Sequence, residues 1–455
     1  MAEAGSTRGA GEFPLFPAGF RLGTGLSAYP SEGSVTADGR GPSVWDTFVR
    51  TPGATADGAT GDVAADAYRR IECDVELLRT LGVRAHRFSL SWSRVLPQGR
   101  GQVNAAGLDH YDRLVDLLLS AGIEPMVTLH HFDLPQSLSD DGGWLNRATA
   151  DAFGEYAGVV AERLADRVAH WVPINDPNVA TVLGYGLGAH APGLRLGLDC
   201  IFAAHHMLLA HGLGAMALRQ AGAQSVGCAT NHAPIWPASD EPEDTGSSKL
   251  FDMLWNACFT EPMLLGRYPT GIDQVLGDVL HPGDLSTIRQ PLDFYGVNFY
   301  NPIRIGISPD DHDMPFTARE VVGYPQTDVG WPIVPDSLRE WLITFRARYR
   351  AALPPLVVTE SGMADNTGPD EHGVIDDSRR VDYLATYLQA LSEAVNRGVD
   401  VQAYYHQSFL DQFNWADGFT QHYGLVHVDP ETQERTPKRS FDWYRALIAS
   451  QPADR

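Results

Sequence analysis

The sequence is poor in cysteine and in basic residues. Its four cysteines, Cys73, Cys200, Cys228 and Cys258, lie far apart and show no Cys-x-x-Cys spacing. We therefore expect buried free thiols, not a zinc site or a redox pair. Lys and Arg number 34 against 57 Asp and Glu, which gives a formal net charge of −23. Such an excess of negative charge disfavours nucleic acids and anionic membranes as partners.

Long hydrophobic runs are also missing. The N-terminal stretch MAEAGSTRGAGEF has no apolar segment of the kind found in secretory signals. No run approaches the roughly 18 consecutive apolar residues of a membrane-spanning helix. We therefore expect a soluble, cytoplasmic protein whose residues 1–12 form a loose terminal segment. The sequence leaves homo-oligomerisation open.

Eight short β-type runs are present, and stretches with helical periodicity separate them. One such stretch is 108–121, with apolar residues three and four positions apart. Alternating strands and helices indicate a parallel sheet, and eight such units predict a closed (β/α)8 TIM barrel, a single domain over 13–450. We expect the Gly-, Pro- and Ser-rich stretches 34–62, 234–250 and 304–332 to be loops on this barrel. The predicted strand runs are Gly19–Leu26, Val83–Trp92, Glu124–Phe132, His170–Asp176, Ser225–Ala233, Asp293–Tyr300, Leu356–Ser361 and Val401–Phe409.

Two of these runs end in an acidic residue. Asp176 lies in His-Trp-Val-Pro-Ile-Asn-Asp-Pro (170–177), and Glu360 lies in Leu-Val-Val-Thr-Glu-Ser-Gly (356–362). In a parallel α/β barrel the carboxyl ends of the strands carry the chemistry. Two carboxylates that face each other across one cleft are the minimum equipment for cleaving a glycosidic bond.

Several strand ends resemble glycoside hydrolase family 1, the retaining β-glycosidases, and the resemblance runs from about Phe13 to Ile448. It implies the same barrel and hydrolysis of a β-glycosidic bond by double displacement, with no cofactor and no metal. It also implies a small glycoside or glycosylated metabolite as the substrate. The matching segments are 87–97, 128–136, 174–177, 293–300, 359–362 and 409–418.

The resemblance assigns catalytic roles to four residues. Glu360 matches the nucleophile, and Arg87 and Tyr300 match the positions that stabilise it. Asp176 stands where the family has its acid/base, normally a glutamate, and its carboxyl is one methylene shorter. Retention needs carboxyl groups about 5–5.5 Å apart and inversion about 6.5–9.5 Å. A slower retaining enzyme, an inverting enzyme and an acid adapted to another leaving group therefore all stay open, as does a vestigial Asp176 in a site that only binds.

The sugar-binding positions are only partly kept. His131, Asn175 and Trp415 match family contacts to the sugar. We expect them to bind the substrate together with Asn298, Gln407 and Asn414 of the matching sixth- and eighth-strand motifs. At four positions the residue type differs. Pro30 replaces a glutamine, Phe132 and Gln407 replace tryptophans, and Asn414 replaces a sugar-binding glutamate.

Pro30 and Phe132 remove polar partners for sugar hydroxyls, and a pocket discriminates strongly by such partners. A deoxysugar or a glycosylated secondary metabolite would suit a less polar pocket. Asn414-Trp-Ala-Asp-Gly offers no cation for a 6-phosphate, which disfavours the phospho-glycosidases of the family. Transglycosylation, a non-hydrolytic reaction and binding alone remain as alternative functions. His130 and His131 are neighbours on a strand and point to opposite faces, so we expect no metal there.

Overall fold

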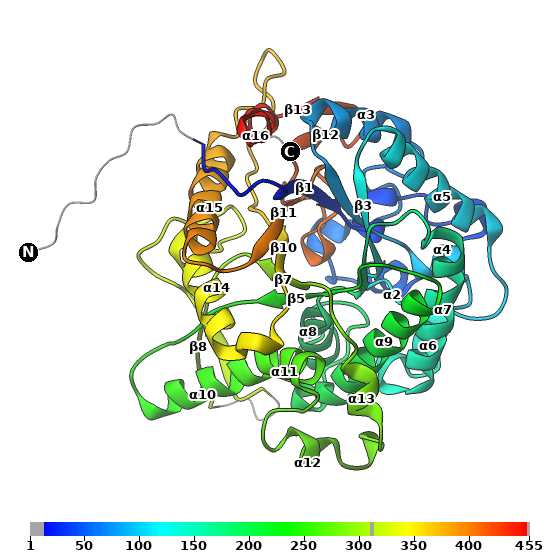
Figure 1. The fold of residues 1–455 in the computed structure, drawn as a ribbon, viewed down its shortest axis with the longest axis vertical. Coiled ribbons are helices and arrows are strands. Elements are labelled where there is room, and N and C mark those ends of the chain that lie inside the picture. The colour runs from blue at the N-terminus through cyan, green and yellow to red at the C-terminus, as the bar shows by residue number, and fades with distance from the viewer. Residues whose placement is uncertain (1–12, 310–313, 453–455) are drawn as a thin grey trace, which may run out of the picture.

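The computed structural model describes residues 13–309 and 314–452, so the predicted loose segment 1–12 lies outside the described residues. Eight parallel strands at the centre follow the order β4-β3-β2-β1-β11-β10-β7-β5 (Figure 1). Bridges from Trp171 to Val226 and from Asn175 to Ala229 join β4 to the β5 side and close the barrel. Each strand lies within one predicted run, which confirms the (β/α)8 TIM barrel. The strands are β1 Arg21–Leu26, β2 Ala85–Ser89, β3 Glu124–His130, β4 His170–Ile174, β5 Cys228–His232, β7 Tyr295–Phe299, β10 Leu356–Ser361 and β11 Val401–Gln407.

Helices surround the barrel and cover its apolar outer face (Figure 1). The longer ones are α3 Ile71–Leu81, α5 Ala105–Ser120, α7 Ala148–Leu164, α9 Ile201–Gln220, α10 Pro242–Asp252, α11 Cys258–Leu265, α14 Pro335–Tyr349, α15 Ser378–Asn396 and α16 Arg439–Ser450. The short ones are α1 Ala28–Glu32, α2 Val44–Phe48, α4 Trp92–Val95, α6 Gln136–Asp140, α8 Pro177–Val179, α12 Ile272–Leu276 and α13 Asp284–Ile288. The C-terminal helix α16 contacts both α15 and α3, so the two ends of the barrel sequence meet there.

The barrel interior has its own small core. Buried residues of six strands contribute to it, two of them from β11, together with Phe294 just before β7. Interior positions of a closed barrel are filled by such side-chain layers, so the centre is packed and is not a pore. The members are Ala85, Met126, Val172, Ala229, Phe294, Val357, Ala403 and Tyr405.

Helix α9 has an unusually apolar composition. The segment Gly197–Gln220 reaches the length and mean hydropathy, 1.4, of a membrane span, and 78% of its most apolar window is buried inside the protein. It packs along α7 in the outer layer. A buried core helix explains this composition fully, because both its faces contact protein.

Two sequence-based expectations need correction. The stretches 234–250 and 304–332 are not only loops, because they form β6 Ile235–Pro237, β8 Ile303–Ile307 and β9 Phe316–Arg319, a separate three-stranded sheet. Cys73 is exposed, whereas the other three thiols are buried. It lies in the first turn of α3, off the stripe of residues that this helix buries.

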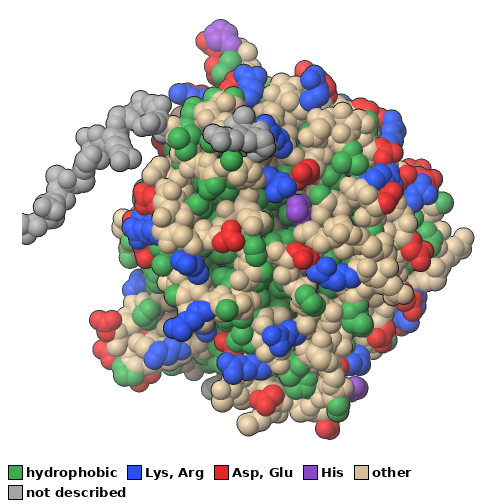
Figure 2. All heavy atoms as spheres, viewed as in Figure 1, with side chains coloured by type: hydrophobic (Ala, Val, Ile, Leu, Met, Phe, Trp, Pro, Cys, Tyr) green, Lys and Arg blue, Asp and Glu red, His purple; other side chains and the backbone are tan. Residues whose placement is uncertain are grey.

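Figure 2 shows acidic and basic side chains interspersed over the face in view, with no extended field of one sign.

Candidate active site

The two predicted carboxylates lie at the carboxyl ends of β4 and β10, which β5 and β7 separate in the barrel. Glu360 is the penultimate residue of β10, and Asp176 is the second residue after β4 and precedes the short helix α8. Both are 4% exposed. Asp176 adopts the left-handed conformation, with φ 43° and ψ 55°, which Asp tolerates better than most residues. Its backbone N–H donates to the carbonyl of Ala229 at 2.9 Å, so the turn is fixed to the next strand.

Glu360 is held by two donors. A guanidinium nitrogen of Arg87, from β2, lies 2.5 Å from Oε1, and the Tyr300 hydroxyl donates to Oε2 at 2.9 Å. Arg87 is itself buried and also donates to the carbonyl of Thr359 and the hydroxyl of Thr128. A buried carboxylate is stable in the ionised form only when it is paired in this way. The arrangement suits a group that must stay anionic.

Asp176 is in a different electrostatic situation. Burial, and next to it the negative charge of Glu360, raise the pKa of Asp176 well above its ordinary value. Asn298, Arg87 and Asn175 oppose this effect, and Asn298 does so most strongly because its Nδ2 donates to Asp176 Oδ1 at 2.8 Å. The Thr359 hydroxyl donates to Asn298 Oδ1 at 2.6 Å, which turns the amide nitrogen toward Asp176. The site therefore contains one paired carboxylate and one carboxyl poised to carry a proton.

A chain of hydrogen bonds connects the sugar-binding candidates to this pair. His131 contacts Ser27 Oγ through Nδ1 at 3.2 Å and Asn175 Nδ2 through Nε2 at 3.1 Å. Because the amide nitrogen can only donate, Nε2 accepts and the proton lies on Nδ1. Burial, and then the charge of Arg87, lower the pKa of His131 well below its usual value, so the ring is neutral. Asn175 Oδ1 in turn accepts from Arg87 and from Asn298.

These residues surround a cavity of about 510 Å³. Seven of the predicted site residues line it, namely His131, Asp176, Tyr300, Glu360, Gln407, Asn414 and Trp415. Three others, Arg87, Asn175 and Asn298, lie behind the lining and hold the residues that face the cavity. Several polar lining residues were not predicted from the sequence, among them the charged Arg304, Arg319 and Glu320 as well as Gln412 and Asp417 of the eighth-strand motif. For Gln412 and Asp417 the only signal was their place in the matching segment 409–418.

Much of the remaining wall is apolar. Phe132 lies 4.9 Å from Trp415, ring centre to ring centre, and Trp45 lies 4.7 Å from the same indole. Val179, Leu183, Trp255 and Trp331 add further apolar surface. Aromatic and aliphatic surface of this kind binds the faces of rings with little loss of side-chain freedom. The cavity therefore combines a few convergent polar groups with an extended apolar wall, as ligand pockets do.

Two other histidines near the site differ in their surroundings. His190 lines the cavity, whereas His232 is buried and contacts Asn256 and Tyr295 through its two ring nitrogens. His130 packs edge-on against Trp92 and Trp144, away from His131. Over 13–309 and 314–452, no group of three or more His, Cys, Asp or Glu residues is arranged to hold a metal ion.

Known proteins match this chain over almost its whole length. The profile described as glycosyl hydrolase family 1 matches residues 14–452. A bifunctional β-D-glucosidase/β-D-fucosidase from Bifidobacterium breve is 42% identical over 96% of this chain and 99% of its own length. The AHE enzyme of Alicyclobacillus herbarius superposes with a TM-score of 0.92 at 40% identity, covering 97% of this chain and 99% of that one. The family 1 β-glucosidase of Thermotoga maritima superposes with a TM-score of 0.91 at 37% identity, covering 96% and 99%.

Proposed function

Since the chain belongs to glycosyl hydrolase family 1 and is a retaining β-glycosidase, we propose that Glu360 is its nucleophile and Asp176 its acid/base. The observation that carries this proposal is the contrast between the two buried carboxyls. Arg87 and Tyr300 pair Glu360, whereas Asp176 has a raised pKa and no direct cationic partner among the described residues. Titratable groups whose environments differ in this way are the usual mark of an acid and its partner.

The first step uses both groups. Asp176 gives its proton to the glycosidic oxygen, and a Glu360 oxygen attacks the anomeric carbon as the bond to the leaving group breaks. A glycosyl ester on Glu360 forms, and the aglycone departs as an alcohol. The Arg87 and Tyr300 contacts to Glu360 hold the attacking carboxylate in place during this step.

The second step reverses the role of Asp176. Once Glu360 is esterified its negative charge is gone, and so is the second-largest cause of the raised pKa of Asp176. The pKa of Asp176 falls, and the carboxylate can take a proton from the attacking water. Water then releases the sugar with its configuration retained and restores the Glu360 carboxylate.

The substrate we propose is a β-glycoside with fewer hydroxyls than glucose, or with an apolar aglycone. Pro30 has no side-chain amide, and Phe132 has no indole donor, so two hydrogen-bonding partners of a glucose ring are missing. The apolar wall of the cavity supports the same choice. The Bifidobacterium relative is named for a fucosidase as well as a glucosidase activity, and D-fucose is a deoxysugar.

Mass spectrometry after incubation with 2-fluoro β-glycosides that carry a 2,4-dinitrophenyl leaving group tests the nucleophile. We expect a covalent adduct on the peptide that contains Glu360, and none in Glu360→Gln. Turnover without an adduct, together with an inverted product anomer by NMR, would contradict double displacement. The probe series also tests the substrate, because a glucoside that reacts far faster than its deoxy analogues would exclude the deoxysugar.

A further inference from the structure

The side chain of Gln412 has hydrogen-bonding capacity that the protein does not use. Gln412 follows β11, is 5% exposed and lines the cavity. Its Oε1 is buried and has no partner, and within the described parts of the chain its Nε2 donates to no residue. An unpaired buried polar group costs about 1–3 kcal/mol. The buried Oε1 leaves no surface for a ligand, whereas a hydroxyl group in the cavity can accept a hydrogen bond from Nε2.

The other amides of the site are already committed. Asn298 donates to Asp176 and Asn175, and Asn175 contacts His131. Asn414 donates to the backbone carbonyls of residues 412 and 421, so it ties its own loop together. Gln407 lines the cavity as well, but it is more exposed than Gln412.

Gln412 also lies beside Pro30, the position at which the family has a glutamine side chain. The backbone N–H of Phe413 donates to the carbonyl of Pro30 at 3.0 Å, so the loop after β11 runs alongside Pro30. Pro30 stands where the family has a glutamine. The neighbouring loop thus places a glutamine amide close to the position from which one was lost.

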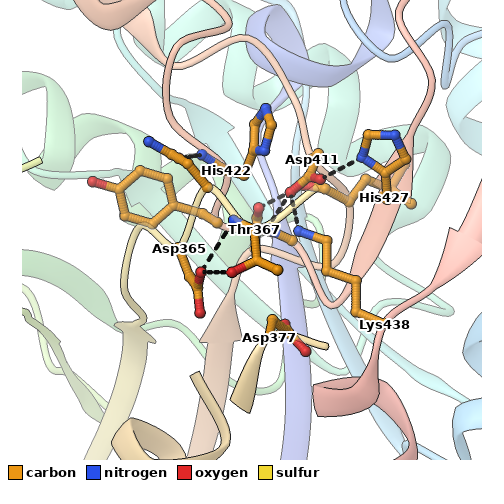
Figure 3. A network of polar contacts seen from close by, with 12 residues as sticks. Asp365, Thr367, Asp377, Asp411, His422, His427 and Lys438 are labelled. Atoms are coloured by element: carbon orange, nitrogen blue, oxygen red, sulfur yellow. Dashed lines mark hydrogen bonds and ion pairs between the residues drawn. The ribbon is translucent and has the colours of Figure 1, made fainter. Parts of the chain in front are cut away.

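The loop is held firmly on both sides of Gln412. The Asp411 carboxylate accepts from Lys438 Nζ at 2.8 Å, from the backbone N–H of Gly424 at 2.9 Å and contacts His427 Nδ1 at 3.2 Å, as Figure 3 shows for the side chains. The Asp411 N–H donates to the carbonyl of Val426 at 2.8 Å. A fixed backbone lowers the entropy that is lost when the side chain binds a ligand.

We propose that Gln412 is a specificity-determining residue that hydrogen-bonds a sugar hydroxyl in the cleavage subsite, in place of the amide that Pro30 cannot supply. This inference rests on the proposed β-glycosidase function. It differs from that proposal because it concerns recognition of the sugar, whereas Glu360 and Asp176 carry the reaction.

Titration calorimetry with 1-deoxynojirimycin, a hydroxylated piperidine, and with analogues that each lack one hydroxyl tests the inference. In the native protein, loss of the contacted hydroxyl should weaken binding about 5- to 150-fold, which corresponds to about 1–3 kcal/mol. Gln412→Ala should weaken binding of the full iminosugar by a similar factor. It should show no further loss with that one analogue, because the partner amide is already gone.

Gln412→Leu provides a second variant that keeps most of the side-chain volume and should behave in the same way. Gln433→Ala is the matched control, because Gln433 is also buried with an unpaired Oε1 but does not line the cavity. It should leave the affinity for every iminosugar unchanged. The melting temperatures of both Gln412 variants should stay at or above that of the native protein, since they remove an unsatisfied polar group.

The outcomes distinguish the proposed role of Gln412 from the proposed β-glycosidase function. If the native protein hydrolyses β-glycosides and Gln412→Ala keeps full affinity and full discrimination against every analogue, the role of Gln412 is wrong and the glycosidase function stands. If the native protein binds no iminosugar and hydrolyses no β-glycoside, the proposed function fails and this inference fails with it.

Discussion

Replacing Asp176 with alanine should slow the enzyme by a factor that depends on the leaving group. An alcohol or phenol of high pKa needs a proton to depart, and Asp176 is the buried carboxyl placed to give it. General acid catalysis contributes about 10²- to 10⁴-fold. This range equals about 2.7–5.4 kcal/mol of transition-state stabilisation, at about 1.36 kcal/mol for each factor of ten. A 2,4-dinitrophenolate leaves without a proton, so its first step should slow by less than about tenfold.

The assay compares kcat/KM for phenyl and 2,4-dinitrophenyl glycosides of the same sugar. The alanine variant also removes the base of the second step, and it leaves space for a small anion where the carboxylate lay. Added azide should therefore raise kcat for the dinitrophenyl substrate and give the β-glycosyl azide, which NMR identifies.

Asp417→Ala is the matched control, because Asp417 is a carboxyl that also lines the cavity but has no assigned role in the reaction. Its loss should affect both substrates by the same factor and should show no azide rescue. Equal losses with the two leaving groups in Asp176→Ala, without an azide product, would refute the assignment of Asp176 as the acid/base.

Three other changes test neighbouring parts of the structure. Asp176→Glu adds one methylene and should raise kcat for ordinary β-glucosides; an unchanged rate in steady-state assays would mean that acid reach is not limiting. Asn298→Ala removes a donor that favours the ionised form of Asp176, so the pKa of Asp176 should rise and the basic limb of the kcat/KM profile should move to higher pH. An unmoved basic limb would rule out that contact as a control on the acid. Lys438→Met leaves the buried Asp411 carboxylate without its ammonium partner, and urea unfolding should show a loss of about 3–5 kcal/mol. Most of that loss should be recovered in the Lys438→Met/Asp411→Leu double variant.

The positions of the strands could be read from the sequence because they depend on local patterns. Each β-type run is short, rich in β-branched and aromatic residues and bounded by turn residues, and each contains one observed strand. The insertion sheet was missed for the same reason. Strands β6, β8 and β9 have three to five residues each and lie within Gly- and Pro-rich stretches, so their own pattern is too short to detect.

Some features of the candidate site could likewise be predicted from the sequence, and others could not. The sequence alone placed Glu360 and Asp176 at strand ends, and the resemblance named their supporting residues. We expected Asn298 to contact the sugar. In the structure its amide donates to Asp176, and the residue lies behind the cavity wall. Strand order brings β7 next to β10, and only that pairing lets Thr359 orient the Asn298 amide.

The sequence by itself thus determined the barrel, the residue types at its strand ends and the shorter acid at position 176. The tertiary structure decided which polar groups are paired and which are not. Pairing depends on neighbours from distant strands, and burial sets the pKa of each group through all the charges around it. For this reason the proton on Asp176 and the unused amide of Gln412 became visible only in the closed barrel.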